Sequence, residues 1–323
     1  MTLAKSRMVI AVLALAGATP AAFAAGYPDH PVRMIVPFTP AGATDMLARL
    51  VGERLGAKLG QSVVIDNRAG AGGNVGAEIA ARAAPDGYTL LMGPASIYAI
   101  SATLYPRLGY DLVKDLVPVS LVANVPHVLV VRNDLAVNSV AELVQLAKRM
   151  PGELNIASQG SGTVSHLEAE LLKHMAGIDM LHIPYKGSAP AVLDLIGGRV
   201  QLMFDSIASA LPHIRAGKLR AIAVASSTRS SLLPNVPTVA ESLPGYSAHS
   251  WLGIFVPAGT PQPVIQRLQR DLAAAIDDPK AQARLVEAGF EPKSSTPEDF
   301  AKLVREEMEK WRPVVKMSGA TPD

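Results

Sequence analysis

Three short glycine-bearing segments contain the residues best suited to bind a ligand. Residues 37–45 read PFTPAGATD, residues 67–74 read NRAGAGGN and residues 157–163 read ASQGSGT. Their small residues let a ligand approach the backbone closely, and each segment opens onto an expected helix whose first N–H groups attract an anion. A single turn of this kind is more typical of an ordinary helix start, capped here by Thr44 or Asp45. Three such turns together predict a site for a carboxylate.

Two charged residues follow the ends of other expected strands. Lys186 lies in residues 185–188, where its ammonium group could pair with a ligand carboxylate. Asp205 directly follows a strand and could accept a hydrogen bond from an amine, a hydroxyl or a bound water. Each residue also has a simpler interpretation, Lys186 as a solvated side chain and Asp205 as the N-cap of the next helix. The sequence leaves both interpretations open.

The glycines of residues 70–76 resemble a dinucleotide-binding pattern that is incomplete. Such a site needs an acidic residue about 20 positions later, at the end of the next strand. That strand ends at residues 92–94 without a carboxylate, and Asp86 precedes it. We therefore expect no nucleotide and no other cofactor.

The sequence also lacks the common motifs of catalysis. It has no Gly-x-Ser-x-Gly elbow, no His-Glu-x-x-His pair and no cysteine, and its seven histidines do not follow a zinc-ligand spacing. The sequence predicts neither an enzyme nor a metal site. The alternative, a hydrolase, would need a nucleophile–base pair among Ser96, Ser161, His166 and Asp205.

The first 24 residues have the three parts of a secretory signal peptide. Lys5 and Arg7 precede nine apolar residues, and residues 22–24 (AFA) form a small-x-small cleavage site. The apolar run is shorter than the about 20 residues that span a bilayer. We expect cleavage after Ala24 and export to the periplasm.

The composition of the remaining chain limits its partners and its source of stability. Removal of residues 1–24 would leave 28 basic and 28 acidic residues, with no block of like charge. That balance excludes a nucleic-acid-binding footprint. Because the chain has no cysteine, an apolar core must stabilise it instead of disulfides.

The elements that position the three turns alternate between strands and helices, which is typical of an α/β fold with mainly parallel sheets. Ligands of such sheets bind at the carboxyl ends of the strands, where the three turns lie. Expected strands cover residues 32–36, 62–66, 89–92, 119–122, 128–131, 155–157, 180–183, 200–204, 219–224 and 250–255. Expected helices cover residues 44–59, 74–83, 96–104, 139–149, 164–176, 189–196, 206–216, 261–277, 279–288 and 297–317.

Two segments are expected to carry the chain between two lobes. Residues 124–126 form the first crossing, and the proline-rich residues 234–246 form the return. The first lobe is therefore discontinuous and comprises residues 25–124 and 248–323, with residues 125–247 as the second lobe. Two crossings imply a hinge and a ligand cleft between the lobes.

With these turns in view, the sequence resembles the Bug-type (TctC-like) solute receptors of tripartite tricarboxylate transporters over essentially its whole length. The resemblance rests on several motifs in family order: residues 36–45 (VPFTPAGATD), 67–74, 85–90 (PDGYTL), 165–167 (SHL), 182–187 (HIPYKG), 217–220 (GKLR) and 257–261 (PAGTP).

The resemblance implies a two-lobed type II periplasmic binding protein, each lobe a mainly parallel sheet flanked by helices. Members hold a ligand carboxylate through backbone amides of the first two turns, partly through ordered water, and the second lobe selects the rest of the ligand. The implied function is capture of a di- or tricarboxylate, an acidic amino acid or an aromatic acid. The implied partners are the membrane components of a tripartite transporter, with a membrane sensor protein as the alternative. The receptor itself is expected to be a monomer.

Carried over to this chain, the resemblance assigns ligand contacts to both lobes. In the first lobe they are Phe38, Thr39, Ala41, Gly42, Thr44, Gly70, Gly72, Gly73, Asn74 and Ser96; in the second they are Ser158, Gly160, Thr163, Tyr185, Lys186, Ser188 and Asp205. One departure matters, because the family's first turn has two glycines and this chain has Ala41 beside Gly42. The extra methyl group restricts the backbone there or narrows the pocket.

Overall fold

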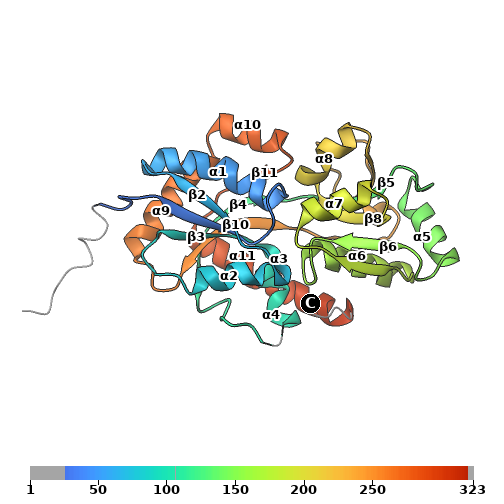
Figure 1. The fold of residues 1–323 in the computed structure, drawn as a ribbon, viewed down its shortest axis with the longest axis horizontal. Helices are drawn as coiled ribbons and strands as arrows, with labels where there is room; N and C mark the ends of the chain where they lie inside the picture. The colour runs from blue at the N-terminus through green and yellow to red at the C-terminus, as the bar shows by residue number, and fades with distance from the viewer. Residues whose placement is uncertain (1–25, 106, 319–323) are drawn as a thin grey trace, which may run out of the picture.

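Two α/β lobes lie side by side, each built around its own β-sheet (Figure 1). The computed structural model describes residues 26–105 and 107–318, so the expected signal peptide lies outside the described part of the chain. In Figure 1, the first lobe contains both the blue N-terminal elements and the orange and red C-terminal elements, and the second lobe is green to yellow. The expected two-lobed α/β architecture is confirmed.

The first sheet has six strands in the order β11-β4-β10-β3-β1-β2. β1 pairs in parallel with β2 and β3, whereas β10 runs antiparallel to β3 and β4. Because β1, β2 and β3 are parallel, the loops after them meet at one edge of the sheet. The strands are β1 (Val32–Val36), β2 (Val63–Asn67), β3 (Thr89–Pro94), β4 (Leu116–Asn124), β10 (Trp251–Pro257) and β11 (Glu291–Pro292).

The second sheet has five strands in the order β7-β6-β8-β5-β9. β6 pairs in parallel with β7 and β8, and β5 is antiparallel to β8 and β9. In each sheet one strand next to a crossing, β10 in the first and β5 in the second, runs opposite to both of its neighbours. The strands are β5 (His127–Arg132), β6 (Asn155–Ser158), β7 (Leu181–Pro184), β8 (Leu202–Ser206) and β9 (Leu219–Val224).

Helices cover the sheets and bury one apolar face each. In α1, for example, Leu47, Val51 and Leu55 are spaced four apart and all lie in the core. The helices of the first lobe are α1 (Ala43–Leu59), α2 (Asn74–Ala81), α3 (Ala95–Ala99), α4 (Ser101–Leu104), α9 (Gln262–Ile276), α10 (Pro279–Glu287) and α11 (Pro297–Ser318). Those of the second lobe are α5 (Val140–Arg149), α6 (Val164–Ala176), α7 (Ser188–Ile196) and α8 (Ile207–Arg215).

Several observed elements are shifted by one or two residues from the expected bounds, β8 and β10 among them, and the larger differences are three. The helix expected over residues 96–104 is divided into α3 and α4 at Ile100. β4 is longer than expected at both ends, and the two-residue strand β11 pairs with it. Within residues 26–105 and 107–318, no helix has the length and apolar character needed to cross a membrane.

The first crossing lies next to the segment that follows the expected return crossing and leads into β10. The backbone N–H of Val125, in the first crossing, donates to the carbonyl of Ser250 at 2.8 Å. The N–H of Ala248 donates to the carbonyl of Ala225 at 3.1 Å. Neighbouring segments can bend together, so this region has the geometry of a hinge.

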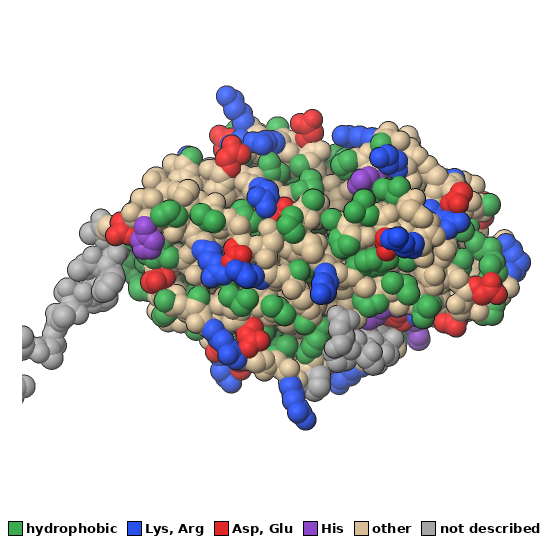
Figure 2. All heavy atoms as spheres, in the orientation of Figure 1, with side chains coloured by type: hydrophobic (Ala, Val, Ile, Leu, Met, Phe, Trp, Pro, Cys, Tyr) green, Lys and Arg blue, Asp and Glu red, His purple; other side chains and the backbone are tan. Residues whose placement is uncertain are grey.

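The lobes also meet at the edge opposite the hinge. The N–H of Thr39 donates to the carbonyl of Lys186 at 3.4 Å, and the Tyr105 hydroxyl donates to the carbonyl of Ser161 at 3.3 Å. The surface of this closed arrangement carries scattered charges of both signs on the face shown in Figure 2.

Candidate ligand-binding site

An inner cavity lies between the lobes, close to the hinge. Its volume in this closed arrangement is about 20 Å³, the space of about one water molecule, so the lobes must move apart slightly to admit a carboxylate. Its walls combine helix starts from both lobes with residues of the two crossings, so a ligand here would contact every moving part. The lining residues are Phe38, Ala43, Thr44, Pro94, Ser96, Val125, His127, Gln159, Val164, Ser206, Ser250 and Leu252.

The N-terminus of α1 faces this cavity without a side-chain cap. Its N-cap residue is Gly42, and no side chain accepts a hydrogen bond from the first turn. By contrast, Thr163 caps α6 and Ser206 caps α8 through their own hydroxyls. The first N–H groups of a 17-residue helix are donors that a carboxylate can satisfy, and the helix dipole favours its charge.

Asp45 holds the first turn in shape and does not compete for that site. Its carboxylate accepts from the N–H of Ala41 at 3.0 Å, from Arg49 at 2.9 Å and from the Asn67 amide at 3.0 Å. Burial raises the pKa of Asp45, but the hydrogen bonds from Arg49, Ala41 and Asn67 outweigh burial, and the net pKa lies below its usual value. The ionised carboxylate thus ties the first turn to the end of β2, because the Asn67 amide also donates to the carbonyl of Phe38 at 3.0 Å.

The second turn packs its backbone against the opposite lobe. Gly72 has φ +61°, and a Cβ placed on it would lie 2.5 Å from the carbonyl oxygen of Ser161. Asn74 shapes this turn from behind, since its amide donates to the carbonyl of Ala71 at 2.7 Å and its carbonyl accepts from the Tyr110 hydroxyl at 3.0 Å. The Asn74 side chain is therefore engaged in supporting the turn.

An outer cavity of about 290 Å³ adjoins the second turn. Phe38 and Gln159 line both cavities, so the two cavities are neighbours that share a wall, and together they are called the elongated site below. Lys186 is an exposed residue of the outer cavity wall, and its ammonium group makes no ion pair with any residue in the described ranges 26–105 and 107–318. The lining residues are Phe38, Gly70, Ala71, Gly72, Gly73, Gln159, Pro184, Tyr185 and Lys186.

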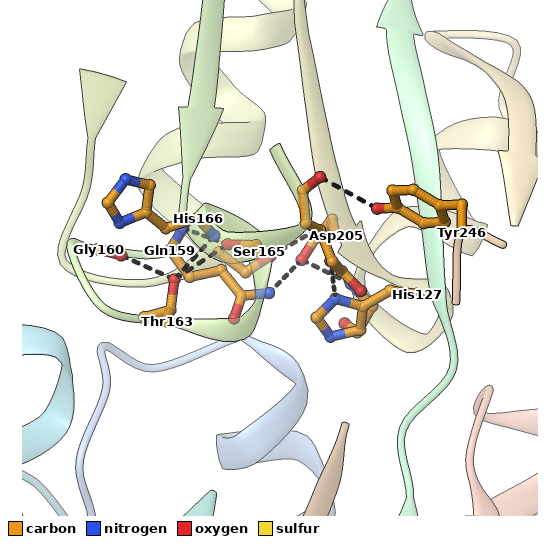
Figure 3. Close-up of polar contacts among 11 residues, drawn as sticks. His127, Gln159, Gly160, Thr163, Ser165, His166, Asp205 and Tyr246 are labelled. Atoms are coloured by element: carbon orange, nitrogen blue, oxygen red, sulfur yellow. Dashed lines mark hydrogen bonds and ion pairs between the residues drawn. The ribbon is translucent and has the colours of Figure 1, made fainter. Parts of the chain in front are cut away.

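Asp205 is fully buried, and both of its oxygens already accept hydrogen bonds from the protein. The Gln159 amide donates to Oδ1 at 2.7 Å, the N–H of Ser206 donates to Oδ1 at 2.8 Å, and the Ser188 hydroxyl donates to Oδ2 at 2.5 Å. Burial raises the pKa of Asp205, against the hydrogen bonds from Ser188 and Gln159. Figure 3 shows Gln159 reaching toward Asp205, so the carboxylate orients Gln159, which lines both cavities.

The third turn is held by its own side chains. The Thr163 hydroxyl donates to the carbonyl of Gly160 at 2.7 Å, and the Ser158 hydroxyl accepts from the N–H of Gly160 at 3.1 Å (Figure 3 shows the first contact). His166 Nδ1 accepts from the N–H of Gly162 at 3.1 Å. Burial, followed by the nearby His182 and Lys173, lowers the pKa of His166 to about 3, so the ring stays neutral and can accept.

The structure brings together many of the residues expected to bind the ligand and places others behind them. Eight of the expected contacts line the cavities: Phe38, Thr44, Ser96, Gly70, Gly72, Gly73, Tyr185 and Lys186. Thr39, Gly42, Gly160 and Ser188 lie at the seam where the lobes meet. Asn74, Ser158, Thr163 and Asp205 direct their polar atoms to neighbouring protein groups.

Ala41 adopts the strained backbone conformation that its methyl group makes unfavourable. Its φ is +67°, a left-handed value normally taken by glycine. Its side chain is exposed and does not belong to the walls of either cavity. The methyl group therefore restricts the backbone, and among the described residues it does not narrow the pocket.

Four polar residues of the cavity walls are not among the contacts named from the sequence: His127, Gln159, Ser206 and Ser250. Gln159 lies within the third turn, and its amide was not distinguished from its glycine neighbours. His127 lies at the start of β5, and its Nδ1 is 2.7 Å from Oε2 of Glu168. The two residues are 41 positions apart, so only the fold reveals the pair.

A nucleophile–base pair lies near the cleft but is buried. The Ser158 hydroxyl is 2.6 Å from Nε2 of His182. Ser158 has no exposed surface, and its hydroxyl also bonds to Gly160. The hydrolase alternative named Ser96, Ser161, His166 and Asp205, and in the described residues no hydrogen bond joins any two of these four side chains.

Comparisons with known proteins agree with this geometry. Residues 47–320 match the model of the tripartite tricarboxylate transporter family receptor. Protein BugT of Bordetella pertussis is 40% identical over 95% of this chain and 95% of its own. A solved R. palustris structure with adipate is 40% identical, with a TM-score of 0.90, and covers 92% of this chain and 100% of its own. The structure of MatC from Rhodopseudomonas palustris with bound malate is 35% identical, with a TM-score of 0.84, and covers 90% of this chain and 100% of its own.

The match extends across both lobes, both crossings and the cleft that holds the uncapped start of α1. Chains with this sequence pattern and this fold are periplasmic solute receptors. The protein described here therefore belongs to the tripartite tricarboxylate transporter receptor family, of the Bug type.

Proposed function

We propose that this protein captures a small carboxylated solute in the periplasm by closing its two lobes around it. The observation that carries the proposal is the uncapped N-terminus of α1 in the inner cavity. A ligand carboxylate there would accept from the first N–H groups of α1, near Ala43 and Thr44. Adipate and malate in the related structures are small carboxylates, which supports the same ligand class here.

The second lobe would select the remainder of the ligand. Gln159, oriented by Asp205, offers its amide group to the middle of the elongated site. Lys186 supplies a positive charge at the outer end. A molecule with an anionic group at each end fits this distribution of donors better than a monocarboxylate.

Delivery to a tripartite tricarboxylate transporter follows from the family and is part of the proposal. The chain would leave the cytoplasm through the signal peptide of residues 1–24 and act as a monomeric binding protein, not as an enzyme. Uptake of a labelled dicarboxylate by spheroplasts should then depend on added protein. Uptake that is equal with and without the protein would refute the transport role while leaving ligand capture standing.

Thermal shift with a panel of acids tests ligand capture. Protein unfolded and refolded to remove bound solutes would be heated with dicarboxylates, tricarboxylates, acidic amino acids, aromatic acids and neutral adipamide. A ligand at a hundredfold excess over Kd stabilises the folded state by about 2.7 kcal/mol, or roughly 5 °C at this chain length. At least one acid should give that shift and adipamide should not; no shift with any acid would overturn the proposal.

A further inference from the structure

His127 lies where the moving parts of the protein meet. It is the first residue of β5, directly after the first crossing, and it lines the inner cavity together with Ala43 and Thr44 at the start of α1. Its backbone carbonyl accepts from the N–H of Ala225, the residue directly after β9, at 2.9 Å. The ring is 4% exposed, so it faces the cavity and not bulk solvent.

Only one of its two ring nitrogens has a partner in the described residues. Nδ1 is 2.7 Å from Oε2 of Glu168, a residue of α6 with no exposed surface. Nε2 makes no hydrogen bond with any residue of the described ranges. Glu168 is anchored in turn, because its backbone carbonyl accepts from the Tyr246 hydroxyl at 3.1 Å (Figure 3).

The need for stability does not explain this buried pair. Replacing a buried ion pair with apolar residues of similar size is often neutral or stabilising. In addition, Oε1 of Glu168 has no hydrogen-bond partner among the described residues, which is unfavourable for a buried carboxylate. A pair that stabilises the fold poorly is a candidate for a role in binding.

The charges around His127 favour its protonated form. Glu168 on α6 and Asp205 at the end of β8 face it. Burial alone lowers the pKa of His127, but the negative charge of Glu168 and the hydrogen bond to it outweigh burial and raise the net pKa. Burial also raises the pKa of Glu168, against the attraction of His127, so the pair holds its shared proton more tightly than either group would alone. Asp205 is occupied by Gln159, Ser188 and Ser206, so Glu168 is the hydrogen-bond partner of the ring. A protonated ring with Nδ1 on Glu168 carries a second N–H at Nε2.

We propose that His127 donates from Nε2 to the inner carboxylate of a dicarboxylate, and that Glu168 is the positioning residue that keeps the ring charged and oriented. The inner carboxylate then lies between the start of α1 in one lobe and His127 in the other. The second carboxylate lies toward Lys186 in the outer cavity. This inference rests on the proposed function and extends it, because it assigns a charged side chain to a carboxylate otherwise held by backbone groups.

Titration calorimetry with adipate and malate separates this role from a structural one. The double variant H127L/E168L removes the whole pair, so its melting temperature should equal or exceed that of the native chain. Its Kd for the better of the two acids should nevertheless rise about 10- to 100-fold, the range for a hydrogen bond to a charged group. The control H174L changes an exposed histidine in the last turn of α6 and should leave both quantities unchanged.

The variant E168Q tests the positioning role through pH. Glutamine keeps an acceptor for Nδ1 but removes the charge, so burial should return the pKa of His127 below its usual value. Above about pH 6.5, E168Q should bind the acid more weakly than the native chain, because its ring has already lost the proton, and its affinity should fall at a lower pH than that of the native chain. This inference alone would be overturned if affinity depended on pH in the same way in E168Q and in the native chain, or if H127L/E168L bound the acid with native affinity. If the native chain bound none of the acids, the proposed function itself would be overturned.

Discussion

Replacement of Gly72 by alanine should prevent the lobes from closing fully while leaving each lobe folded. The added Cβ would lie 2.5 Å from the carbonyl oxygen of Ser161 in the opposite lobe, where ordinary contact begins at 3.4 Å. The lobes must therefore separate by about 0.9 Å at this point, because the Cβ is fixed to its Cα and its neighbour is a backbone carbonyl, so neither can rotate away.

The expected loss of affinity follows from the second-lobe contacts that the separation weakens. A ligand that keeps the first lobe but loses two or three hydrogen bonds to the second loses about 2 to 3 kcal/mol of binding free energy. That loss corresponds to a Kd about 30- to 150-fold higher. Calorimetry with adipate measures the affinity, and X-ray scattering measures whether the ligand still reduces the radius of gyration.

Gly60 provides the matched control for this experiment. It ends α1 with φ +73°, close to the φ of Gly72, and a Cβ there would have no neighbour within 4 Å. Both G60A and G72A should lose about 1 to 2 kcal/mol of stability from the left-handed backbone. Only G72A should lose affinity, and native affinity with native closure in G72A would refute the claim that the seam between the lobes must form.

Three further predictions concern stability. H166F should lower the free energy of unfolding at neutral pH by about 1 to 3 kcal/mol, because it leaves the N–H of Gly162 without an acceptor. In the native chain the pKa of His166 is lowered to about 3 in the folded state, below its unfolded value. His166 therefore makes the free energy of unfolding fall by up to about 1.4 kcal/mol per pH unit below pH 6.5. Urea titrations should show a flatter dependence of this free energy on pH in H166F. The hydrogen bond from Arg229, followed by that from the backbone of Thr238, lowers the pKa of Glu241 to about 2. Glu241 therefore stabilises the folded state above its unfolded pKa, and this stabilisation is lost as the pH falls toward 2. E241Q should remove this part of the acid dependence of the urea midpoint. A41G should raise the melting temperature or leave it unchanged, because relief of the φ of +67° offsets the added chain entropy, and a fall of several degrees would contradict the strain assigned to Ala41.

Local patterns were sufficient to predict most elements. The strand at Val32–Val36 and the helix at Val164–Ala176 were predicted with the observed bounds, because a β-branched run and a four-residue apolar spacing are local signals. The strand Glu291–Pro292 was not predictable, since it exists only through pairing with β4. The break at Ile100 likewise had no proline or glycine to announce it.

The site was predictable where backbone binds ligand and not where side chains meet across the fold. Glycines 70, 72 and 73 could be identified because their residue type alone permits close approach. Asp205 was identified as a contact, yet the structure uses it to orient Gln159, which depends on residues 46 positions apart. His127 became a candidate only once α6 placed Glu168 beside it.

A crystal structure with the acid that gives the largest thermal shift would test the central claim most directly. The account predicts closed lobes and a ligand carboxylate oxygen within about 3 Å of the backbone nitrogens at the start of α1, near Ala43 and Thr44. A ligand whose carboxylates lie away from that helix start, or one bound with the lobes open, would contradict it.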